Sequence, residues 1–414
     1  MFSPSTLKGA VGSHCRRGFA SHLLFSWRAW RLGESQVPIA IEGLRLIQCF
    51  PGVLGGLARD RFSLPSRVCV SSSLFLACLA AWREQHMQLA GIRPAIISVL
   101  ADGRFHSGSA IGERFGISRT AVWKHIRHLQ GFGLDVFSVR GRGYRLAGAL
   151  ELLDPDAILE AVTDPWFRSH GALEVRLETD STNQRLMRKL ADGDVHAQVL
   201  LAEFQTDGKG RRGSAWISPF ASGIIMSMGW HFEATPQTVT ALSLAAGVAV
   251  ATVLENHTGL QVFLKWPNDI ICKAQKIGGI LIESKGETAG PFDVVIGIGM
   301  NVSLPDRVIH SLGQPVTDIT RNLSGSVSRN TLAAALISTL AAMLREFDQH
   351  GFSPFIEKWR ALDYFKGKHA TLMFPDRRVR GTVQGIDENG FLVMEVEGSR
   401  HVFSSGDLSL RLGV

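Results

Sequence analysis

The central part of the chain contains the stretch Glu203-Phe-Gln-Thr-Asp-Gly-Lys-Gly-Arg-Arg-Gly-Ser-Ala-Trp216, directly after the apolar run 198–202. Such a run predicts a buried strand. Three glycines let the backbone approach a ligand closely, and Lys209, Arg211 and Arg212 gather positive charge on one short loop. The loop therefore predicts binding of an anion such as a triphosphate or phosphate ester. The spacing differs from that of a Walker loop, and a flexible basic turn is the alternative.

Residues 151–350 alternate strand-like and helical runs, which favours an α/β or α+β domain with a central sheet. Within it, Lys265-Trp-Pro-Asn-Asp269 ends the apolar run 261–264, and the proline stops that strand. Asn268 and Asp269 are then expected at the carboxyl end of the strand, where open sheets bind ligands. Their side-chain oxygens are suitable ligands for Mg²⁺ beside phosphates.

Two more segments carry glycines in apolar surroundings. Lys276-Ile-Gly-Gly-Ile-Leu-Ile-Glu283 places a lysine before a glycine pair that starts a buried strand. That lysine can reach a carboxylate or a phosphate as a point charge. Val294-Val-Ile-Gly-Ile-Gly-Met-Asn301 predicts another buried strand, whose glycines permit close packing or the approach of a ligand.

The segment Glu178-Thr-Asp-Ser-Thr-Asn183 follows a strand-like run at 173–177 and opens a helix expected at 183–190. Small hydroxyl and amide side chains at a helix start can cap the helix and present donors and acceptors to a polar ligand. Capping alone is the alternative for this segment.

Residues 87–150 predict a winged helix-turn-helix. The residues at 92–100 have helical spacing, a short second helix is expected at 109–115, and Ser118 is placed to cap a third helix that ends near residue 129. Gly116 supplies the left-handed residue that the turn needs. Residues 135–146 alternate like two strands around an Arg-Gly-Arg-Gly tip, which is the shape of a wing. The DNA-binding residues predicted on the third helix and the wing are Ser118, Arg119, Thr120, Lys124, Arg127, Arg140 and Arg142.

The distribution of charge supports this division of the chain. Residues 1–86, 87–150 and 151–414 carry net charges of +6, +6 and −5, which together give the +7 of the whole chain. A small basic segment beside a larger acidic one is typical of a nucleic-acid-binding module joined to another domain. Solvated surface arginines, or a winged helix that contacts protein, are the alternatives.

The sequence predicts a fold for the C-terminal end of the chain but not for the N-terminal end. Residues 1–86 show no sustained helical or strand period in their apolar residues. They are interpreted as an unassigned extension that is either disordered or upstream of a working start at Met87. A targeting segment and an added interaction segment are the alternatives. The apolar run 68–82 of this extension is shorter than the roughly 20 residues that span a bilayer. Residues 365–414 contain short strand-like runs around turns and predict a small antiparallel barrel.

Cysteine is scarce in the predicted domains. Only Cys272 lies beyond residue 86, and no pair of cysteines has the spacing of a zinc or redox motif. This usage fits a reducing cytoplasm without a disulfide framework, and no membrane association is expected.

The motifs Asp-Ser-Thr-Asn, Gln-x-x-Gly-Lys-Gly-Arg-Arg-Gly, Lys-Trp-Pro-Asn-Asp, Lys-Ile-Gly-Gly-Ile-Leu-Ile-Glu and Gly-Ile-Gly-Met-Asn together resemble the signature set of biotin protein ligases, in the same order. With the winged helix in front, residues 87–414 resemble the bacterial bifunctional biotin ligases and biotin operon repressors. The resemblance implies an α+β chain with a winged helix-turn-helix (87–150), a mixed α/β catalytic domain similar to class II synthetases (151–364) and an SH3-like β-barrel (365–414).

The resemblance also assigns site residues. Arg211, Lys265 and Lys276 are the expected catalytic residues, and Asn268 and Asp269 are the expected Mg²⁺ ligands. The residues expected to bind biotin or its adenylate are Ser181, Thr182, Asn183, Gln205, Lys209, Gly210, Arg211, Arg212, Trp216, Lys276, Gly279, Asn301 and Arg411. Lys209 departs from the family, which commonly has arginine there, and so loses bidentate binding geometry.

The implied reaction joins biotin and ATP to biotinyl-5′-AMP and then transfers biotin to a lysine of the biotin carboxyl carrier protein of acetyl-CoA carboxylase. The resemblance further implies that the adenylate is a corepressor and that a homodimer binds operator DNA to repress biotin synthesis genes. A biotin-sensing repressor without ligase activity and a ligase of the lipoate type are the alternative functions.

Overall fold

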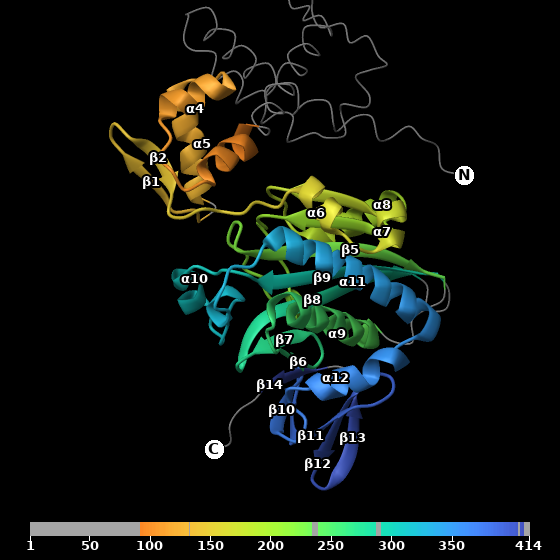
Figure 1. Ribbon diagram of the computed structural model, residues 1–414. Coiled ribbons are helices and arrows are strands. Elements are labelled where there is room, and N and C mark those ends of the chain that lie inside the picture. The colour runs from red at the N-terminus through yellow and green to blue at the C-terminus, as the bar shows by residue number, and fades with distance from the viewer. Residues whose placement is uncertain (1–91, 132, 234–238, 287–290, 405, 410–414) are drawn as a thin grey trace, which may run out of the picture. The chain divides into compact units, whose positions relative to one another are not determined.

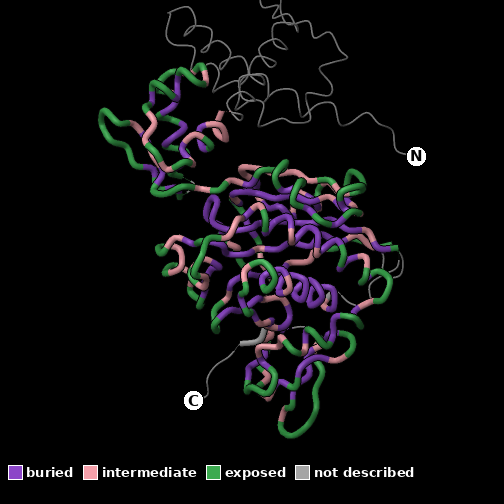
Figure 2. Tube along the Cα trace, in the orientation of Figure 1, coloured by how far each residue is buried: buried purple, intermediate pink, exposed green. Residues whose placement is uncertain are grey.

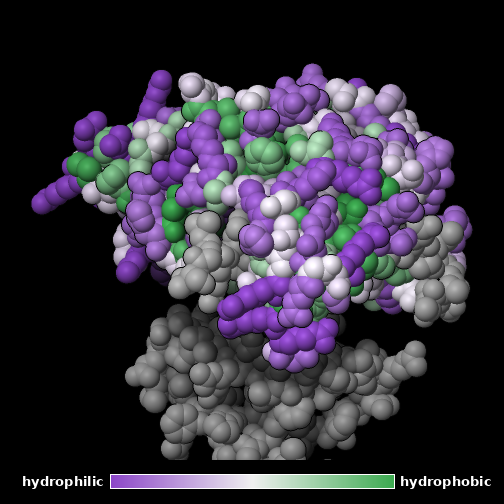
Figure 3. All heavy atoms as spheres, turned by 90° about the horizontal axis from the view of Figure 1, so that it is seen from below, coloured by the Kyte–Doolittle hydropathy of each residue, from purple (hydrophilic) through white to green (hydrophobic). Residues whose placement is uncertain are grey.

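The computed structural model describes residues 92–131, 133–233, 239–286, 291–404 and 406–409 (Figure 1). All of them belong to the second of two units, Met1–Glu84 and Gln85–Val414. The expectations for residues 1–86, for 87–91 and for Arg411 lie outside the described residues. Within the described ranges, no helix is long and apolar enough to cross a membrane. The face that Figure 3 shows is mostly hydrophilic, with apolar side chains in scattered patches.

The winged helix-turn-helix is confirmed. After a helix over residues 92–100, helix α4 (Gly108–Phe115) is capped by Ser107 and ends at Gly116, whose φ is 65°. Ser118 Oγ accepts a hydrogen bond from the amide of Ala121 (3.1 Å) and so caps helix α5 (Arg119–Gly131), as its position in the sequence predicts. Strands β1 (Val136–Val139) and β2 (Gly143–Leu146) form the antiparallel hairpin of the wing.

A seven-stranded sheet forms the centre of the next domain, in the order β3-β4-β5-β9-β8-β7-β6. Strands β3 and β4 are parallel, and every other neighbouring pair is antiparallel. This mixed sheet with helices on it confirms the expected α+β class. The strands are β3 (Ala172–Arg176), β4 (Gln198–Ala202), β5 (Gly223–Phe232), β6 (Phe263–Lys265), β7 (Asp269–Cys272), β8 (Gln275–Gly286) and β9 (Phe292–Asn301).

Helices cover both faces of this sheet. The long helices α9 (Val239–Thr258) and α11 (Arg329–His350) pack against each other and against β5 and β8, and α8 (Thr182–Asp192) packs against β5 and β9 (Figure 1). The shorter helices are α6 (Pro155–Ala161), α7 (Pro165–His170), α10 (Asp306–Ser311) and α12 (Ile356–Leu362), with single 3₁₀ turns at Arg211–Gly213, Thr320–Asn322 and Ser353–Phe355.

Strand residues alternate between the two faces of the sheet. On β9, Val294, Ile296, Ile298 and Met300 belong to the large core beneath α9 and α11, which appears as buried purple tube in Figure 2. The intervening positions of β9, which include Gly297 and Gly299, therefore point to the opposite face, beneath α8. Strand β9 thus contributes apolar side chains to the core on one face, and on the opposite face its glycines leave the backbone without side chains.

The C-terminal strands form a five-stranded antiparallel sheet in the order β13-β12-β11-β10-β14. Their bounds are β10 (His369–Met373), β11 (Arg378–Ile386), β12 (Leu392–Val396), β13 (Ser399–Phe403) and β14 (Asp407–Ser409). Leu372, Val383 and Leu392 join the same hydrophobic cluster as the central sheet. The indole of Trp266 also donates a hydrogen bond to the carbonyl of Gly390 (3.0 Å), so this small sheet is fixed to the central domain.

Asp363 lies where the central domain passes into the C-terminal sheet. It pairs with Leu264 in a β-bridge, and its Oδ1 accepts a hydrogen bond from the amide of Phe365 (2.9 Å). Its Oδ2 is buried and makes no hydrogen bond within the described part of the chain. Burial raises the pKa of Asp363 to about 6, against the lowering effect of the amides of Phe365 and Lys366.

The raised pKa of Asp363 predicts that the free energy of unfolding depends on pH. Between the ordinary value of 3.8 and about 6, the folded chain binds more protons at Asp363 than the unfolded chain, so stability falls as the pH rises through this window. Asp363→Asn keeps the acceptor for the Phe365 amide and removes the charge. We expect the effect of D363N on the free energy of unfolding to be more favourable at pH 8 than at pH 4 by about 1–3 kcal/mol in urea titrations. The exposed Asp376→Asn serves as control, and a D363N effect that is the same at both pH values would contradict this assignment.

Candidate functional site

A cavity of about 530 Å³ lies on the face of the central sheet beneath the start of α8. Its walls come from the basic loop after β4, the hairpin β6–β7 and strands β5, β8 and β9. The sequence motifs are therefore brought together from distant parts of the chain. The predicted residues that line the cavity are Ser181, Thr182, Asn183, Gln205, Lys209, Gly210, Arg211, Arg212, Trp216, Lys265, Asn268, Asp269, Lys276 and Gly279.

One end of the cavity is built from hydroxyl and amide side chains. Gln205 Oε1 accepts hydrogen bonds from the amide of Thr182 (2.8 Å) and from its hydroxyl (3.2 Å). Asn183 Nδ2 donates to the carbonyl of Leu281 (3.1 Å) and to Glu283 Oε2 (3.0 Å). These contacts fix the orientation of both amides at a wall that can offer donors and acceptors to a polar ligand.

Asp180 fixes the helix start that carries Ser181 to Asn183. A hydrogen bond from Arg188 holds the pKa of Asp180 well below its usual range, and the amide of Ser181 donates to the same carboxylate (2.8 Å). Ser181 Oγ in turn lies at capping distance from the amide of Gln184 (3.5 Å). The predicted capping role is therefore present, and it leaves these residues at the edge of the cavity.

Glycines on β9 make the floor of the cavity. A Cβ at Gly297 would lie 2.2 Å from Asn183 Oδ1, and one at Gly299 would lie 2.5 Å from the ring of Trp216. Both distances are far shorter than van der Waals contact, so any side chain here would displace a wall residue. These two glycines therefore allow Asn183 and Trp216 to approach the sheet.

The basic loop is closed by its own backbone. The amide of Trp216 donates to the carbonyl of Gly208 (2.8 Å), and the amide of Gly210 donates to that of Ser214 (2.7 Å). A short 3₁₀ turn, Arg211–Gly213, forms the tip, where Arg212 has a φ of 53°. The loop thus presents Lys209, Arg211 and Arg212 along one rim of the cavity.

Asp269 holds two further lysine ammonium groups at the cavity. Its oxygens lie 2.6 Å from Lys276 Nζ and 3.0 Å from Lys265 Nζ. Burial raises the pKa of Asp269, but the charges of Lys276 and Lys265 outweigh it, and the net pKa is below the ordinary value. Lys276 Nζ also lies 5.6 Å from the centroid of the Trp216 ring. The carboxylate keeps two cations side by side, facing a space suited to phosphate or carboxylate.

The predicted metal pair, Asn268 and Asp269, lies at the cavity and contacts neighbouring groups of the chain. Both oxygens of Asp269 are engaged by lysine, and the side-chain amide of Asn268 donates to the carbonyl of Ile280 (2.7 Å). No group of three His, Cys, Asp or Glu side chains within the described ranges could hold a metal ion. A Mg²⁺ ion held by Asn268 and Asp269 would bind Asn268 Oδ1 and share the Asp269 carboxylate with the two lysines, and this role stays a prediction. The sequence motif correctly placed them at the cavity but could not reveal that lysines occupy the carboxylate.

One predicted binding residue within the described part of the chain does not line the cavity. Asn301 is buried at the end of the cavity strand β9, where its side-chain amide donates to the carbonyl of Thr317 (3.1 Å), and it does not line the cavity. Arg411 is outside the described residues. Conversely, Gln314 lines the cavity without any signal in the sequence that would have singled it out.

Ser227 is a further site residue that sequence reasoning missed. It is fully buried on β5, and its Oγ lies 2.7 Å from Thr182 Oγ1 and 2.6 Å from Asn183 Oδ1. It supports the polar wall from beneath. As a polar residue within the apolar strand Gly223–Phe232, it carried a signal that could have been noticed.

The candidate DNA-binding residues lie on the third helix and the wing. Arg119, Thr120, Lys124 and Arg127 are exposed on α5, whose inner side is buried by Val122, His125, Ile126 and Leu129. Ser118 acts as the helix cap. On the wing Arg140 is exposed, and the guanidinium of Arg142 lies 4.2 Å from the centroid of the Phe105 ring. Phe105 therefore positions one of the two predicted wing arginines.

Comparison with known proteins gives one consistent family. Residues 177–301 match the biotin/lipoate A/B protein ligase family, residues 93–145 match an HTH domain, and residues 367–411 match the biotin protein ligase C-terminal domain. The bifunctional ligase/repressor BirA of Salmonella typhimurium is 38% identical over 319 residues, which cover 76% of this chain and 96% of that protein. BirA of Escherichia coli is 37% identical with the same coverage. The solved biotin protein ligase from Aquifex aeolicus in complex with biotin and ATP is 24% identical over 58% of this chain and 98% of that chain, with a TM-score of 0.49.

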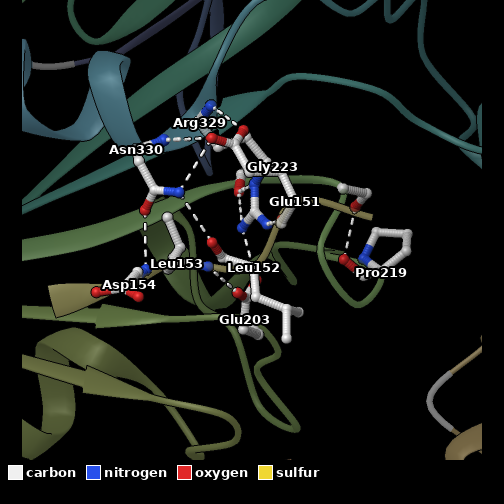
Figure 4. A network of polar contacts seen from close by, with 10 residues as sticks. Glu151, Leu152, Leu153, Asp154, Glu203, Pro219, Gly223, Arg329 and Asn330 are labelled. Atoms are coloured by element: carbon white, nitrogen blue, oxygen red, sulfur yellow. Dashed lines mark hydrogen bonds and ion pairs between the residues drawn. The ribbon is translucent and has the colours of Figure 1, made fainter. Parts of the chain in front are cut away.

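A buried ion pair outside the predicted set supports the cavity strands. Arg329, at the start of α11, lies 2.6 Å from Glu203 Oε2 and donates to the carbonyls of Gly223 (3.0 Å) and Glu151 (2.7 Å), as Figure 4 shows. Glu203 also accepts a hydrogen bond from the amide of Leu153. One guanidinium thus joins the segment after the wing, the strand end that leads to Gln205, and the first residue of β5.

Removing this guanidinium is expected to destabilise the central domain strongly. Arg329→Met leaves the carboxylate of Glu203, which is 3% exposed, without its cation. We expect the free energy of unfolding to fall by about 3–5 kcal/mol in urea titrations. Arg360→Met breaks an exposed pair with Glu357 and should cost at most about 1 kcal/mol. Equal losses in the two variants would show that burial of the Arg329 pair is unimportant.

Proposed function

We propose a function for the central cavity from the fact that this chain belongs to the family of bifunctional biotin ligase/repressors. In this proposal the cavity joins biotin to ATP and passes the biotinyl group to a protein lysine. The acceptor in this proposal is the biotin carboxyl carrier protein of acetyl-CoA carboxylase. The observation that carries the proposal is the cavity itself, which combines a wall of uncharged polar side chains with a rim of five cationic residues. Those five are Lys209, Arg211, Arg212, Lys265 and Lys276.

The polar wall suits the ring system of biotin. Ser181, Thr182, Asn183 and Gln205 supply hydroxyl and amide groups that can pair with the donors and the acceptor of a cyclic urea. Hydrogen bonds to neighbouring groups already fix Asn183 and Gln205. A fixed polar wall loses little conformational entropy when a ligand binds, which favours affinity.

The cationic rim suits the first step of the reaction. An oxygen of the biotin carboxylate attacks the α-phosphate of ATP, which forms the mixed anhydride biotinyl-5′-AMP and releases pyrophosphate. Lys276, Lys265 and Arg211 would place positive charge where the α-phosphate gains negative charge. Trp216, which lines the cavity beside Lys276, is the candidate to cover the adenine ring. Most of the catalytic effect would come from positioning two bound substrates.

The second step needs no nucleophile from the protein. The amine of the acceptor lysine attacks the carbonyl carbon of the anhydride, an amide bond forms, and AMP leaves. The loop 208–216, whose cations would pair with the adenylate phosphate, would also keep water from the anhydride. We assign no step to Mg²⁺, because Asp269 is engaged by two lysines; an ion that accompanies ATP would be bound by its phosphates.

The winged helix supports a second role at DNA. The exposed side of α5 and the wing carry the cationic groups Arg119, Lys124, Arg127, Arg140 and Arg142. We propose that biotinyl-5′-AMP acts as corepressor and that this chain works in the cytoplasm. A homodimer of the chain would bind an operator of biotin synthesis genes that consists of two half-sites. In such a chain, binding of the adenylate in the cavity would raise the affinity for DNA, and binding of DNA would raise the affinity for the adenylate by the same factor.

Lys276 provides a sharp test of the ligase. The purified chain with biotin and ATP should release pyrophosphate, and Lys276→Gln should lower that rate at least about 100-fold. Lys273→Gln is the matched control, because Lys273 is exposed on the turn before β8 and does not line the cavity. Circular dichroism verifies folding. Absence of pyrophosphate release from the folded wild type would overturn the ligase, and activity with lipoate in place of biotin would indicate the alternative family member. Pyrophosphate release without labelling of a biotin carrier protein would favour a repressor that does not transfer biotin.

Arg119 tests the DNA function separately. We expect Arg119→Ala to weaken binding to a random-sequence duplex about fivefold to tenfold, and to lower the slope of log affinity against log salt concentration by about one, because one phosphate contact is lost. Pyrophosphate release should not change. Arg168→Ala, an exposed arginine on α7, is the charge-matched control. Parallel loss of both activities in R119A would contradict separate sites.

A further inference from the structure

Trp123 is a large aromatic residue on the exposed side of α5. Its side chain is 45% exposed, although the neighbouring Val122 is completely buried. An α-helix turns about 100° per residue, so positions four apart lie in one row along its surface. Arg119, Trp123 and Arg127 form such a row on the side away from the core. Trp123 therefore lies between two arginines on the helix that is predicted to meet DNA.

The same region gathers other exposed apolar groups. Six large hydrophobic side chains are exposed within the described ranges, and three of them, Trp123, Phe137 and Val139, belong to α5 and the wing. A single exposed apolar residue is common on protein surfaces. The ring of Trp123 is unusual because it lies between arginine side chains. The guanidinium of Arg127 lies 5.2 Å from the centroid of the Trp123 ring, which is within the range of a cation–π interaction.

Charge favours DNA over a protein as the partner of this row. Helix α5 contains no aspartate or glutamate, and residues 87–150 carry a net charge of +6. A positive helix face of this kind is complementary to a polyanion. Lys124 and Arg127 can meet phosphates or base edges, whereas the indole ring offers mainly an apolar surface. An apolar group on DNA is therefore the partner that suits most of this ring.

The major groove displays only one apolar group. Its base edges carry hydrogen-bond donors and acceptors, except for the C5 methyl of thymine. We propose that Trp123 contacts a thymine methyl in each half-site and thereby sets a preference for a T·A pair at that position. This inference rests on the proposed DNA function and adds to it the residue that reads one base pair. The ring also lies beside the guanidinium of Arg127, which can bind an adjacent base or phosphate through its planar group.

The experiment uses the whole chain with biotin and ATP, and a library of random-sequence DNA duplexes from which bound sequences are selected. Each thymine of the selected duplex is then replaced in turn by deoxyuridine, which keeps the base pair and removes only the methyl. We expect one replacement per half-site to weaken binding of the wild type about fourfold, as measured by fluorescence anisotropy. Trp123→Ala should show no such loss at that position, and its own selected sequences should not prefer thymine there.

Two variants serve as controls. Trp123→Phe keeps an aromatic surface and should retain part of the sensitivity to the methyl. Lys124→Ala removes a neighbouring cation on α5 and should weaken all duplexes alike while the thymine preference stays. Because Trp123 is exposed and lies outside the hydrophobic clusters, its replacement should leave the thermal stability of the chain unchanged.

Three results would overturn the role of Trp123. W123A that keeps the same thymine preference would exclude a methyl contact. W123A that changes only the oligomeric state in sedimentation, and not the base preference, would assign the ring to a protein interface. A wild type that selects no sequence would refute the DNA function itself, and that failure is distinct because it precedes any comparison with W123A.

Discussion

The absence of side chains at Gly297 and Gly299 is the constraint on which the cavity depends. Strand β9 is buried on both faces, so the residues on either side of these glycines must fill the core beneath α9 and α11. The glycines leave the other face bare, and Asn183 and Trp216 occupy the space that a Cβ would need. The same strand thus stabilises the sheet through one face and forms the floor of the site with the other.

Charge in the site is arranged before any substrate is present. Repulsion between the ammonium groups of Lys265 and Lys276 would push them apart, and the carboxylate of Asp269 between them offsets that repulsion. Burial disfavours the charged carboxylate, but the charges of the two lysines outweigh burial and keep the pKa of Asp269 below its ordinary value. An incoming phosphate can therefore meet two cations that are already placed and that need little reorganisation, which is the condition for strong electrostatic catalysis.

The sequence predicted those features whose chemistry is local. Ser118 caps α5 and Gly116 makes the turn as expected, because caps and turns depend on a few neighbouring residues. The glycine–arginine loop and the Lys-Trp-Pro-Asn-Asp motif also meet at one cavity, as their positions after strands implied. Pairings between distant residues were beyond the sequence. It did not reveal that lysines engage Asp269, that Asn301 donates to Thr317, or that Ser227 supports Asn183.

The same limit applies to the network around Arg329, whose partner Glu151 lies 178 residues earlier in the chain. This pairing bears on where one folding module ends and the next begins. Glu151 accepts hydrogen bonds from Ser328 and Asn330 through its carboxylate and from Arg329 through its carbonyl, so it belongs structurally to α11 although it follows the wing in sequence. A shortened protein that begins at Glu151 would keep this junction intact. One that begins only a few residues later would remove the partner of Ser328, Arg329 and Asn330 at the start of α11, so a successful dissection of the chain must separate its modules before Glu151.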